Sequence, residues 1–319
     1  MNGNPFKLGT FATSGGGAFA AIILDDDAIP LTAAAIACKN ALASVTTMLA
    51  SVTTIQGLLE VWDANFAALQ ELVAFLEKER RPGAQKLASL RALPPVARPG
   101  KMFYAAQNFQ EHVDEMLRAG MTPASGPKFT GEKSTSDPYL FLKAPSTLCG
   151  ANDDIAIPLG LKKIDWEAEI ALAIGKPGKH IKAERALDHV AGYTCFVDGS
   201  VRDYQKFSVT SGKNFPGTGP LGPWLVTTDE IADPSRLTLT TRLNGAQVQH
   251  ATTDQLIYSI PQIIAFCSDF TALSPGDVIA TGTPEGVGHS RKPPLWMKPR
   301  RCARSRDQQH WRVAHADCR

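Results

Sequence analysis

The stretch DWEAEIALAIG, residues 165–175, places acidic residues at every second position and then becomes apolar. On a β-strand alternate side chains point to the same face, so Asp165, Glu167 and Glu169 would share one side. Trp166 within the acidic group and the apolar run after it indicate a buried strand. Buried carboxylates repel one another and lose hydration, so this strand predicts a positive partner. A solvated polar face is the alternative interpretation.

A divalent cation would turn the mutual repulsion of these carboxylates into a shared attraction. Hard ions such as Mg²⁺, Mn²⁺ or Ca²⁺ prefer carboxylate oxygens. A third ligand is then expected from a neighbouring strand, and Asp198 ends the apolar run of YTCFVD, residues 193–198. Taken alone, Asp198 is equally well interpreted as a turn-capping carboxylate.

Composition excludes several classes of protein. Residues 291–319 hold nine of the 33 Lys and Arg residues and two of the 31 Asp and Glu residues. The other 290 residues therefore carry 24 basic and 29 acidic groups, a balance of −5, which argues against nucleic-acid binding. No apolar run reaches the roughly 18 residues of a membrane span, and no basic segment precedes an apolar core near Met1. We therefore expect a cytoplasmic protein with no membrane contact.

The chain divides into segments with different patterns of apolar, polar and turn-forming residues. Residues 1–98 combine strand patterns with helical patterns and predict a small N-terminal domain of α/β type. The Pro-rich connector LPPVARPGK, residues 93–101, marks the expected boundary. Residues 99–299 show short β-rich segments between Gly and Pro turns, which favours a mostly-β sandwich or roll with a few helices. The predicted fold class is α+β, mostly β.

Several segments occur together in an order that resembles the fumarylacetoacetate hydrolase family. Besides the acidic strand, they are NFQEHVDE (108–115), FLKAPS (141–146), VDGSVRDYQ (197–205), GKNFPGTGPLGPWLVT (212–227) and the long stretch 243–288. VDGS stands where the family more often has NDxS, and the Asp is retained. The resemblance implies a mixed β-sandwich roll as the catalytic domain, preceded by a small α/β domain.

The resemblance also implies a role for individual residues. The metal ligands would be Glu167, Glu169 and Asp198, holding Mg²⁺ or Mn²⁺, with Ca²⁺ as a further option, and Asp165 would support them. The implied catalytic residues are His112, Glu115, Lys213 and Gln205. The implied substrate-binding residues are Thr283, Gly282 and Arg202. On sequence alone, surface polarity explains Lys213 and Gln205 equally well, and a lone histidine is more often structural.

The implied activity is that of a metal-dependent hydrolase acting on C–C bonds in ketonic substances. Its substrate would be a 2,4-dioxo acid such as an acylpyruvate, cleaved by water so that the leaving group departs as an enolate held by the metal. The same chemistry serves an oxaloacetate-type decarboxylase or a diacid isomerase or hydratase, and a protein of another class would keep the fold without activity. The expected partners are a small keto acid and a second copy of the chain in a homodimer.

Residues 300–319 form a basic tail that does not fit the rest of the chain. The family continues at this point with a Gly-Asp turn and closing strands, whereas this sequence shows no strand periodicity. Asp307-Gln308-Gln309-His310-Trp311, read one base later, encodes a pattern of the type I-x-x-I-G. We therefore hypothesise a single-base frameshift near Pro299, which resequencing of the codons there would refute by showing no shift.

Overall fold

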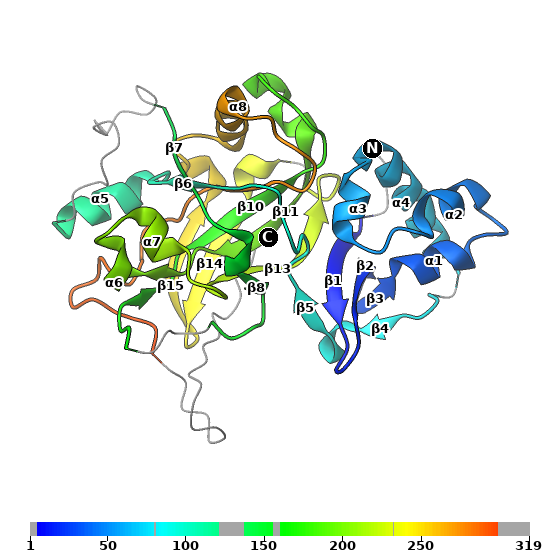
Figure 1. Cartoon of the computed structure of the whole chain (residues 1–319), viewed down its shortest axis with the longest axis horizontal. Coiled ribbons are helices and arrows are strands. Elements are labelled where there is room, and N and C mark those ends of the chain that lie inside the picture. Colours follow the sequence, from blue (N-terminus) through cyan, green and yellow to red (C-terminus); the bar gives the residue numbers. More distant parts are fainter. Residues whose placement is uncertain (1–4, 80, 121–136, 156–159, 232, 299–319) are drawn as a thin grey trace.

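The computed structural model describes residues 5–79, 81–120, 137–155, 160–231 and 233–298 (Figure 1). A twelve-stranded mixed sheet runs through them in the order β4-β3-β2-β1-β13-β11-β10-β16-β6-β7, with β5 against β1 and β8 against β13. Its strands are Lys7–Ala12 (β1), Ala18–Leu24 (β2), Asp27–Pro30 (β3), Gln85–Lys86 (β4), Arg91–Leu93 (β5), Met102–Ala106 (β6), Tyr139–Leu142 (β7), Leu148–Gly150 (β8), Ala168–Ile174 (β10), Val190–Val197 (β11), Gly219–Thr227 (β13) and Val278–Ala280 (β16). Most pairs are antiparallel, while β13 with β8 and β16 with β6 are parallel.

Two short ladders and the helices complete the fold. Ile164–Asp165 (β9) pairs with Ser200–Val201 (β12), and Thr238–Leu243 (β14) forms a hairpin with Ala246–Thr252 (β15). The α-helices are Leu31–Ala37 (α1), Ala43–Leu49 (α2), Ile55–Leu59 (α3), Trp62–Leu76 (α4), Gln110–Arg118 (α5), Arg202–Gln205 (α6), Val209–Lys213 (α7) and Ile260–Phe270 (α8). Single 3₁₀ turns cover Leu87–Ser89, Pro145–Thr147, Ala183–His189, Pro234–Arg236 and Thr253–Gln255. This architecture confirms the predicted α+β, mostly β class, and within the described ranges no helix has the length and apolarity to cross a membrane.

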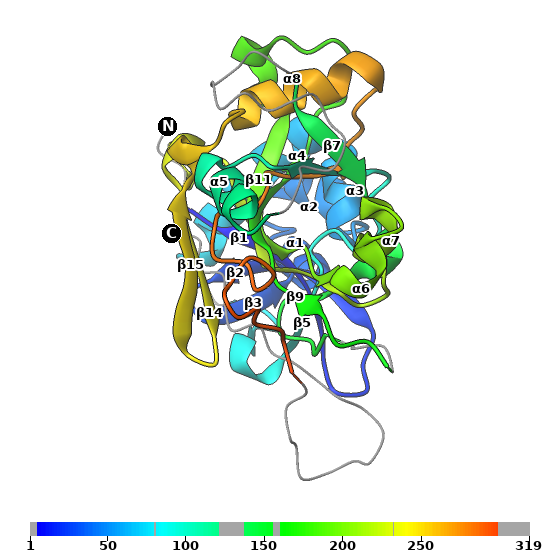
Figure 2. The same cartoon turned by 90° about the vertical axis from the view of Figure 1, so that its left-hand side faces the viewer.

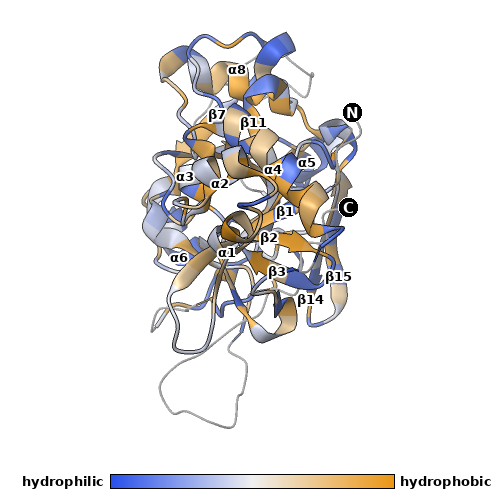
Figure 3. Ribbon diagram, turned by 90° about the vertical axis from the view of Figure 1, so that its right-hand side faces the viewer, coloured by the Kyte–Doolittle hydropathy of each residue, from blue (hydrophilic) through white to orange (hydrophobic). Residues whose placement is uncertain are grey.

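The N-terminal elements β1 to β3 and α1 to α4 gather at one end of the molecule (Figure 1). Their longest helix, α4, buries Trp62, Leu69 and Leu72 on one side, as a 3.6-residue period requires. The strand β2, with the sequence AFAAIIL, is largely hydrophobic along its length (Figure 3). These elements therefore have apolar faces that must be covered by other parts of the chain.

The N-terminal segment shares its sheet and its core with the segment that follows. Strand β1 pairs antiparallel with β13, with Leu8 opposite Leu225. One buried apolar cluster combines Phe6 and Leu8 with Phe196 and Leu225. The boundary predicted at residues 98 and 99 lies between β5 and β6, and the division into domains stays a prediction.

Strand β10 is buried along its whole length because both of its faces are covered. Ile170 and Leu172 belong to the apolar cluster that contains helix α8 residues such as Ile263. Ala171 and Ala173 face the cluster that β10 shares with the N-terminal elements. Two covered faces explain why the strand reads as a continuous apolar run. Figure 2 views the molecule from the side on which α5, α6 and α7 lie.

We expect Leu8→Ala to destabilise the protein by about 2–5 kcal/mol, because it leaves a cavity in the shared cluster. Leu8 has an exposed fraction of 0%, whereas Ile36 is 59% exposed and Ile36→Ala is a matched control with little expected effect. Urea unfolding monitored by circular dichroism and by tryptophan fluorescence should give one coincident transition in both variants. Two separate transitions, with only one shifted by Leu8→Ala, would show that the N-terminal segment unfolds independently.

Candidate metal centre and acid–base site

Three carboxylates meet where the ladder between β10 and β11 ends. Ala168 pairs with Val197 as the last residues of the ladder at this end. Glu167 immediately precedes Ala168 and Asp198 immediately follows Val197, and the Asp198 N–H donates to the Glu167 carbonyl at 2.7 Å. The antiparallel register therefore places these two residues side by side, and Glu169 follows one residue inside the strand.

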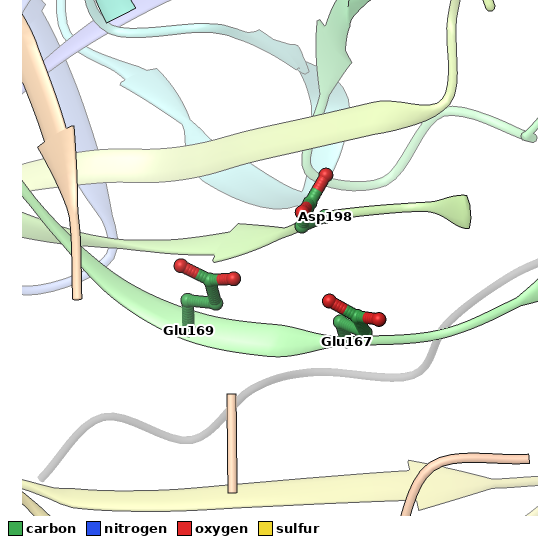
Figure 4. Close-up of side chains that lie close together, drawn as sticks. All are labelled: Glu167, Glu169 and Asp198. Atoms are coloured by element: carbon green, nitrogen blue, oxygen red, sulfur yellow. The ribbon is translucent and has the colours of Figure 1, made fainter. Parts of the chain in front are cut away.

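The carboxylates of Glu167, Glu169 and Asp198 face one another (Figure 4). One ligand oxygen from each lies within 4.8 Å of the others, and all three residues are buried. Oxygens bound to one Mg²⁺ or Ca²⁺ ion lie about 2.0–2.6 Å from it, so oxygens this close can share an ion. Among the residues that the structure describes, this is the one cluster of at least three His, Cys, Asp or Glu ligand atoms. The all-carboxylate donor set fits the hard divalent cation expected from the sequence.

Positive side chains surround this cluster, which we call the carboxylate triad. Lys213 Nζ donates to Glu167 Oε2 at 2.5 Å and to Asp198 Oδ2 at 2.6 Å. Lys143 Nζ donates to Asp198 Oδ1 at 2.5 Å. Arg202 Nη2 donates to Glu167 Oε1 at 2.5 Å. These cations come from α7, from the residue after β7 and from the start of α6, so the triad holds three separate segments together.

The triad residues differ in their affinity for protons. Burial alone would raise the pKa of Glu167, but the charges of Lys213, Arg202 and His112 lower this pKa to about 2. Burial, followed by the charges of Asp198 and Glu167, raises the pKa of Glu169 well above its ordinary value. The only hydrogen bond that the described residues give to the Glu169 carboxylate is from the Gly282 N–H, at 2.9 Å to Oε2. Glu169 therefore holds a proton more strongly than Glu167 does.

Asp165 lies outside the triad and contacts residues around it. The strand is interrupted after Asp165, which ends β9, and ladder pairing resumes at Ala168. The Asp165 carboxylate is fully buried and accepts from the N–H groups of Gly288 at 2.7 Å and His289 at 3.0 Å. It also accepts from Arg202 Nε at 2.9 Å. Asp165 thus connects Arg202 to the loop that follows β16.

His112 and Glu115 lie on one face of the first turns of α5. His112 Nδ1 is 3.4 Å from Glu115 Oε2, and both Glu115 oxygens accept from the Gly286 N–H at 3.0 Å. Burial alone would raise the pKa of Glu115, but hydrogen bonds from His112, Ser290 and Gly286 lower this pKa below its ordinary value. A carboxylate that stays ionised orients the imidazole and stabilises its protonated form.

One cavity of about 430 Å³ is lined by Glu167 and Glu169 of the triad and by His112 of the His112–Glu115 pair. Residues that line it include His112, Glu167, Glu169, Arg202, Gln205, Lys213, Thr283 and His289, together with apolar side chains such as Met116, Phe141 and Val287. Gln205 Oε1 accepts from Arg202 Nη1 at 2.8 Å, which fixes the orientation of its amide. The cavity therefore combines a candidate cation site, an imidazole and cationic or amide donors.

Two of the predicted substrate-binding groups make other contacts. The Thr283 hydroxyl lines the cavity, but it donates to the Ala168 carbonyl at 3.0 Å and accepts from Gln249 Nε2 at 2.9 Å. The Gly282 N–H donates to Glu169 instead of facing the cavity. Arg202 lines the cavity while it binds Glu167 and Asp165. These three residues organise the site, and substrate contact by any of them stays a prediction.

Sequence reasoning gave no role to two buried residues of the site. Lys143 binds Asp198, and its signal was a single lysine within the otherwise apolar and Pro-containing segment FLKAPS. Gln249 accepts from the Ala168 N–H at 3.2 Å and donates to Thr283, which holds the start of β10 against the loop after β16. Gln249 lies in a polar hairpin strand, and no feature of its surroundings in the sequence distinguishes it.

Comparison with known proteins connects this geometry to a family. Residues 101–313 match the family model described as Fumarylacetoacetate (FAA) hydrolase C-terminal. This match includes the triad, the His112–Glu115 pair and the cavity. It also runs past Pro299, where the structure describes no residues, so the tail predicted at 300–319 and its suspected frameshift stay hypotheses.

Relatives with three different named activities resemble the chain. It is 39% identical over 239 residues, 72% of each chain, to the mitochondrial Oxaloacetate tautomerase FAHD2A of Homo sapiens. A maleylpyruvate hydrolase from Sphingobium sp. SYK-6, solved with manganese(II) and pyruvate, superposes with a TM-score of 0.65 at 27% identity, covering 88% of this chain and 90% of that one. A 5-carboxymethyl-2-hydroxymuconate delta-isomerase from Mycobacterium smegmatis gives 0.61 at 27% identity, with coverages of 88% and 89%.

We expect Mn²⁺ to stabilise the protein more as the pH rises. In the cation-free folded protein Glu169 keeps its proton above its ordinary pKa of 4.5, whereas the unfolded chain releases it. The contribution of Glu169 to stability therefore falls as the pH rises above 4.5 towards the raised pKa, and a bound cation would displace this proton. The increase in Tm on adding Mn²⁺ should grow between about pH 5 and 8. An increase that is independent of pH, or unchanged in Glu169→Gln, would contradict this assignment.

Proposed function

This chain belongs to the fumarylacetoacetate hydrolase family, and we propose that it is a divalent-metal-dependent hydrolase that cleaves a C–C bond in a 2,4-dioxo acid. The observation that supports the proposal best is that two members of the carboxylate triad, Glu167 and Glu169, line one cavity with His112, which in turn contacts Glu115. Membership confirms the resemblance and the fold type that the sequence indicated. The reaction itself is our proposal.

The triad would hold Mg²⁺ or Mn²⁺. When bound, the cation would polarise the carboxylate and adjacent keto oxygen of a 2-oxo acid and stabilise the negative charge of an enolate. Lys213 and Arg202 keep Glu167 ionised, and Lys213 also orients Asp198, before the cation arrives. A manganese ion together with pyruvate in the Sphingobium maleylpyruvate hydrolase supports this choice of metal and product class.

The protein's own groups supply proton transfer and charge stabilisation. His112 would remove a proton from water, and Glu115, fixed by the Gly286 N–H, would stabilise the resulting imidazolium. The hydroxide equivalent adds to the carbonyl remote from the carboxylate, and Lys213 with the Gln205 amide would stabilise the oxyanion. Collapse breaks the C–C bond, the electron pair leaves with the pyruvyl fragment as an enolate, and a proton returned by His112 converts it to pyruvate. The other product is the carboxylic acid of the acyl group.

Keto–enol tautomerisation of oxaloacetate is the second candidate, and the identity of 39% to a human oxaloacetate tautomerase favours it. This reaction would use His112 to move a proton to and from carbon, with no attack by water. Decarboxylation of oxaloacetate and isomerisation or hydration of a diacid rest on the same enolate chemistry, and the M. smegmatis delta-isomerase supports keeping isomerisation among them. An inactive protein with the same fold is the candidate from another class.

The biological setting is proposed separately from the chemistry. A homodimer and a cytoplasmic location stay predictions from the sequence. The human relative is named as a mitochondrial protein. A small keto acid is the partner that the cavity supports, because cationic Arg202 and Lys213 line it together with apolar side chains such as Phe141.

We expect the purified chain, loaded with Mn²⁺, to convert acylpyruvates into pyruvate and a carboxylic acid, with quantified pyruvate as the readout. Glu169→Ala removes one ligand of the triad and should reduce metal-dependent turnover to background, while Glu71→Ala, an exposed change on α4, should leave it unaltered. Oxaloacetate assayed in parallel separates the candidates: loss of enol absorbance without pyruvate indicates tautomerisation, and pyruvate with CO₂ indicates decarboxylation. Full activity of Glu169→Ala would contradict the role of the triad.

A further inference from the structure

Lys143 is the second lysine that binds Asp198, and its side chain is buried. It directly follows β7, and its side chain has an exposed fraction of 0%. Its ammonium nitrogen donates to Asp198 Oδ1 at 2.5 Å. Lys143 does not line the cavity, although Phe141, two residues earlier, does. Asp198 does not line the cavity either, so the Lys143–Asp198 contact lies behind the lining side chains, which include Lys213.

Aromatic rings complete the surroundings of Lys143. Its nitrogen lies 5.6 Å from the centre of the Tyr104 ring and 5.4 Å from the centre of the Phe196 ring. Both rings are buried and lie against each other, with centroids 5.1 Å apart. A ring face attracts a cation, but it does not form an ion pair with the cation as a carboxylate does. Among the described residues Asp198 is the one carboxylate that Lys143 binds, so the two groups form a fixed pair.

Lys213 binds the other oxygen of the same carboxylate in a different setting. Its nitrogen donates to Asp198 Oδ2 and to Glu167 Oε2, and its side chain lines the cavity. A cation entering the triad from the cavity would compete with Lys213 for these oxygens. Lys143 has no access to the cavity and would stay in place. The two oxygens of Asp198 are thus distinguished by the lysine that each one accepts from.

We propose that Lys143 is a positioning residue for the metal site: it retains Asp198 Oδ1, so that Oδ2 alone is presented to a divalent cation once Lys213 withdraws. This inference rests on the proposed metal site. It gives Asp198 one ligand oxygen and a fixed orientation before a cation arrives. It also gives the two lysines opposite effects on cation binding, since Lys143 supports the ligand and Lys213 competes for it.

A role in charge balance alone makes the opposite prediction for Lys143. Removing a buried positive charge beside three carboxylates increases their attraction for a divalent cation. If Lys143 only offsets charge, Lys143→Met should bind Mn²⁺ more tightly than the unaltered protein. If Lys143 positions Asp198, the same variant should bind more weakly despite the extra negative charge. The sign of the change therefore separates the two roles.

The experiment is a titration of the cation-free full-length chain with Mn²⁺, in which the electron paramagnetic resonance signal of free Mn²⁺ gives the bound fraction. We expect Lys143→Met to raise the Kd at least about tenfold, the range found when groups that orient metal ligands are removed. We expect Lys213→Met to lower the Kd. Lys101→Met is the matched control, because Lys101 pairs with buried Asp277 at 2.8 Å outside the triad, and it should leave the Kd unchanged.

Each outcome decides between the alternatives. An equal or lower Kd for Lys143→Met overturns the positioning role while leaving the metal site in place. Absence of Mn²⁺ binding by the unaltered chain overturns both the metal site and this inference. If circular dichroism shows that Lys143→Met does not fold, Lys143→Leu is the second variant, because it also removes both the hydrogen-bond donor and the charge. Its Kd should lie above that of the unaltered chain, and an equal or lower value overturns the proposal.

Discussion

Four carboxylates are buried where the β10–β11 ladder ends, and the rest of the site depends on how their charge is offset. Asp165, Glu167, Glu169 and Asp198 are all buried. An unpaired buried charge costs several kcal/mol, so such a cluster persists only with partners. Arg202, Lys143 and Lys213 supply three positive charges at hydrogen-bond distance. Glu169 has no cationic side chain among its hydrogen-bond donors in the described residues, and burial, followed by the charges of Asp198 and Glu167, raises its pKa.

This electrostatic requirement also explains the arrangement of the cavity wall. Lys143, after β7, is distant in sequence from Arg202 in α6 and Lys213 in α7, and these three cations bind one group of carboxylates. Backbone N–H groups of the loop after β16 bind Asp165, Glu169 and Glu115. The loop thereby fixes the strand and helix α5 relative to each other. The distance between the triad and the imidazole is set by buried ionic contacts that a change at either end would disturb.

The sequence predicted the parts of the site that local patterns encode. Alternation placed Glu167 and Glu169 together, and the end of an apolar run identified Asp198. The same alternation placed Asp165 on their face, whereas the interruption between β9 and β10 directs it to Arg202 and Gly288 instead. A period-two pattern cannot reveal such a break, because the break depends on pairing with β12, more than thirty residues away.

Contacts between residues that are distant in the chain were also not predictable from the sequence. The N-terminal segment was expected as a small unit that combines strands and helices, and both kinds of element occur in it. Nothing in the local sequence indicates that β1 pairs with β13, or that Leu8 packs in one cluster with Leu225. The roles of Lys143 and Gln249 were not predicted for the same reason, because their partners are distant in the chain.

The central claim is that a divalent cation in the triad shares a cavity with the imidazole of His112. Nuclear magnetic resonance of histidine ring signals, recorded as Mn²⁺ is added, tests it directly, because the paramagnetic ion broadens the signals of nearby nuclei. The His189 carbonyl accepts from the Gly175 N–H beyond the far end of β10, eight residues or about 25 Å from Glu167, so His189 serves as the internal reference. We expect substoichiometric Mn²⁺ to broaden the His112 ring signals and to leave the His189 ring signals sharp. Equal broadening of both, or a sharp His112 signal at saturation, would contradict it.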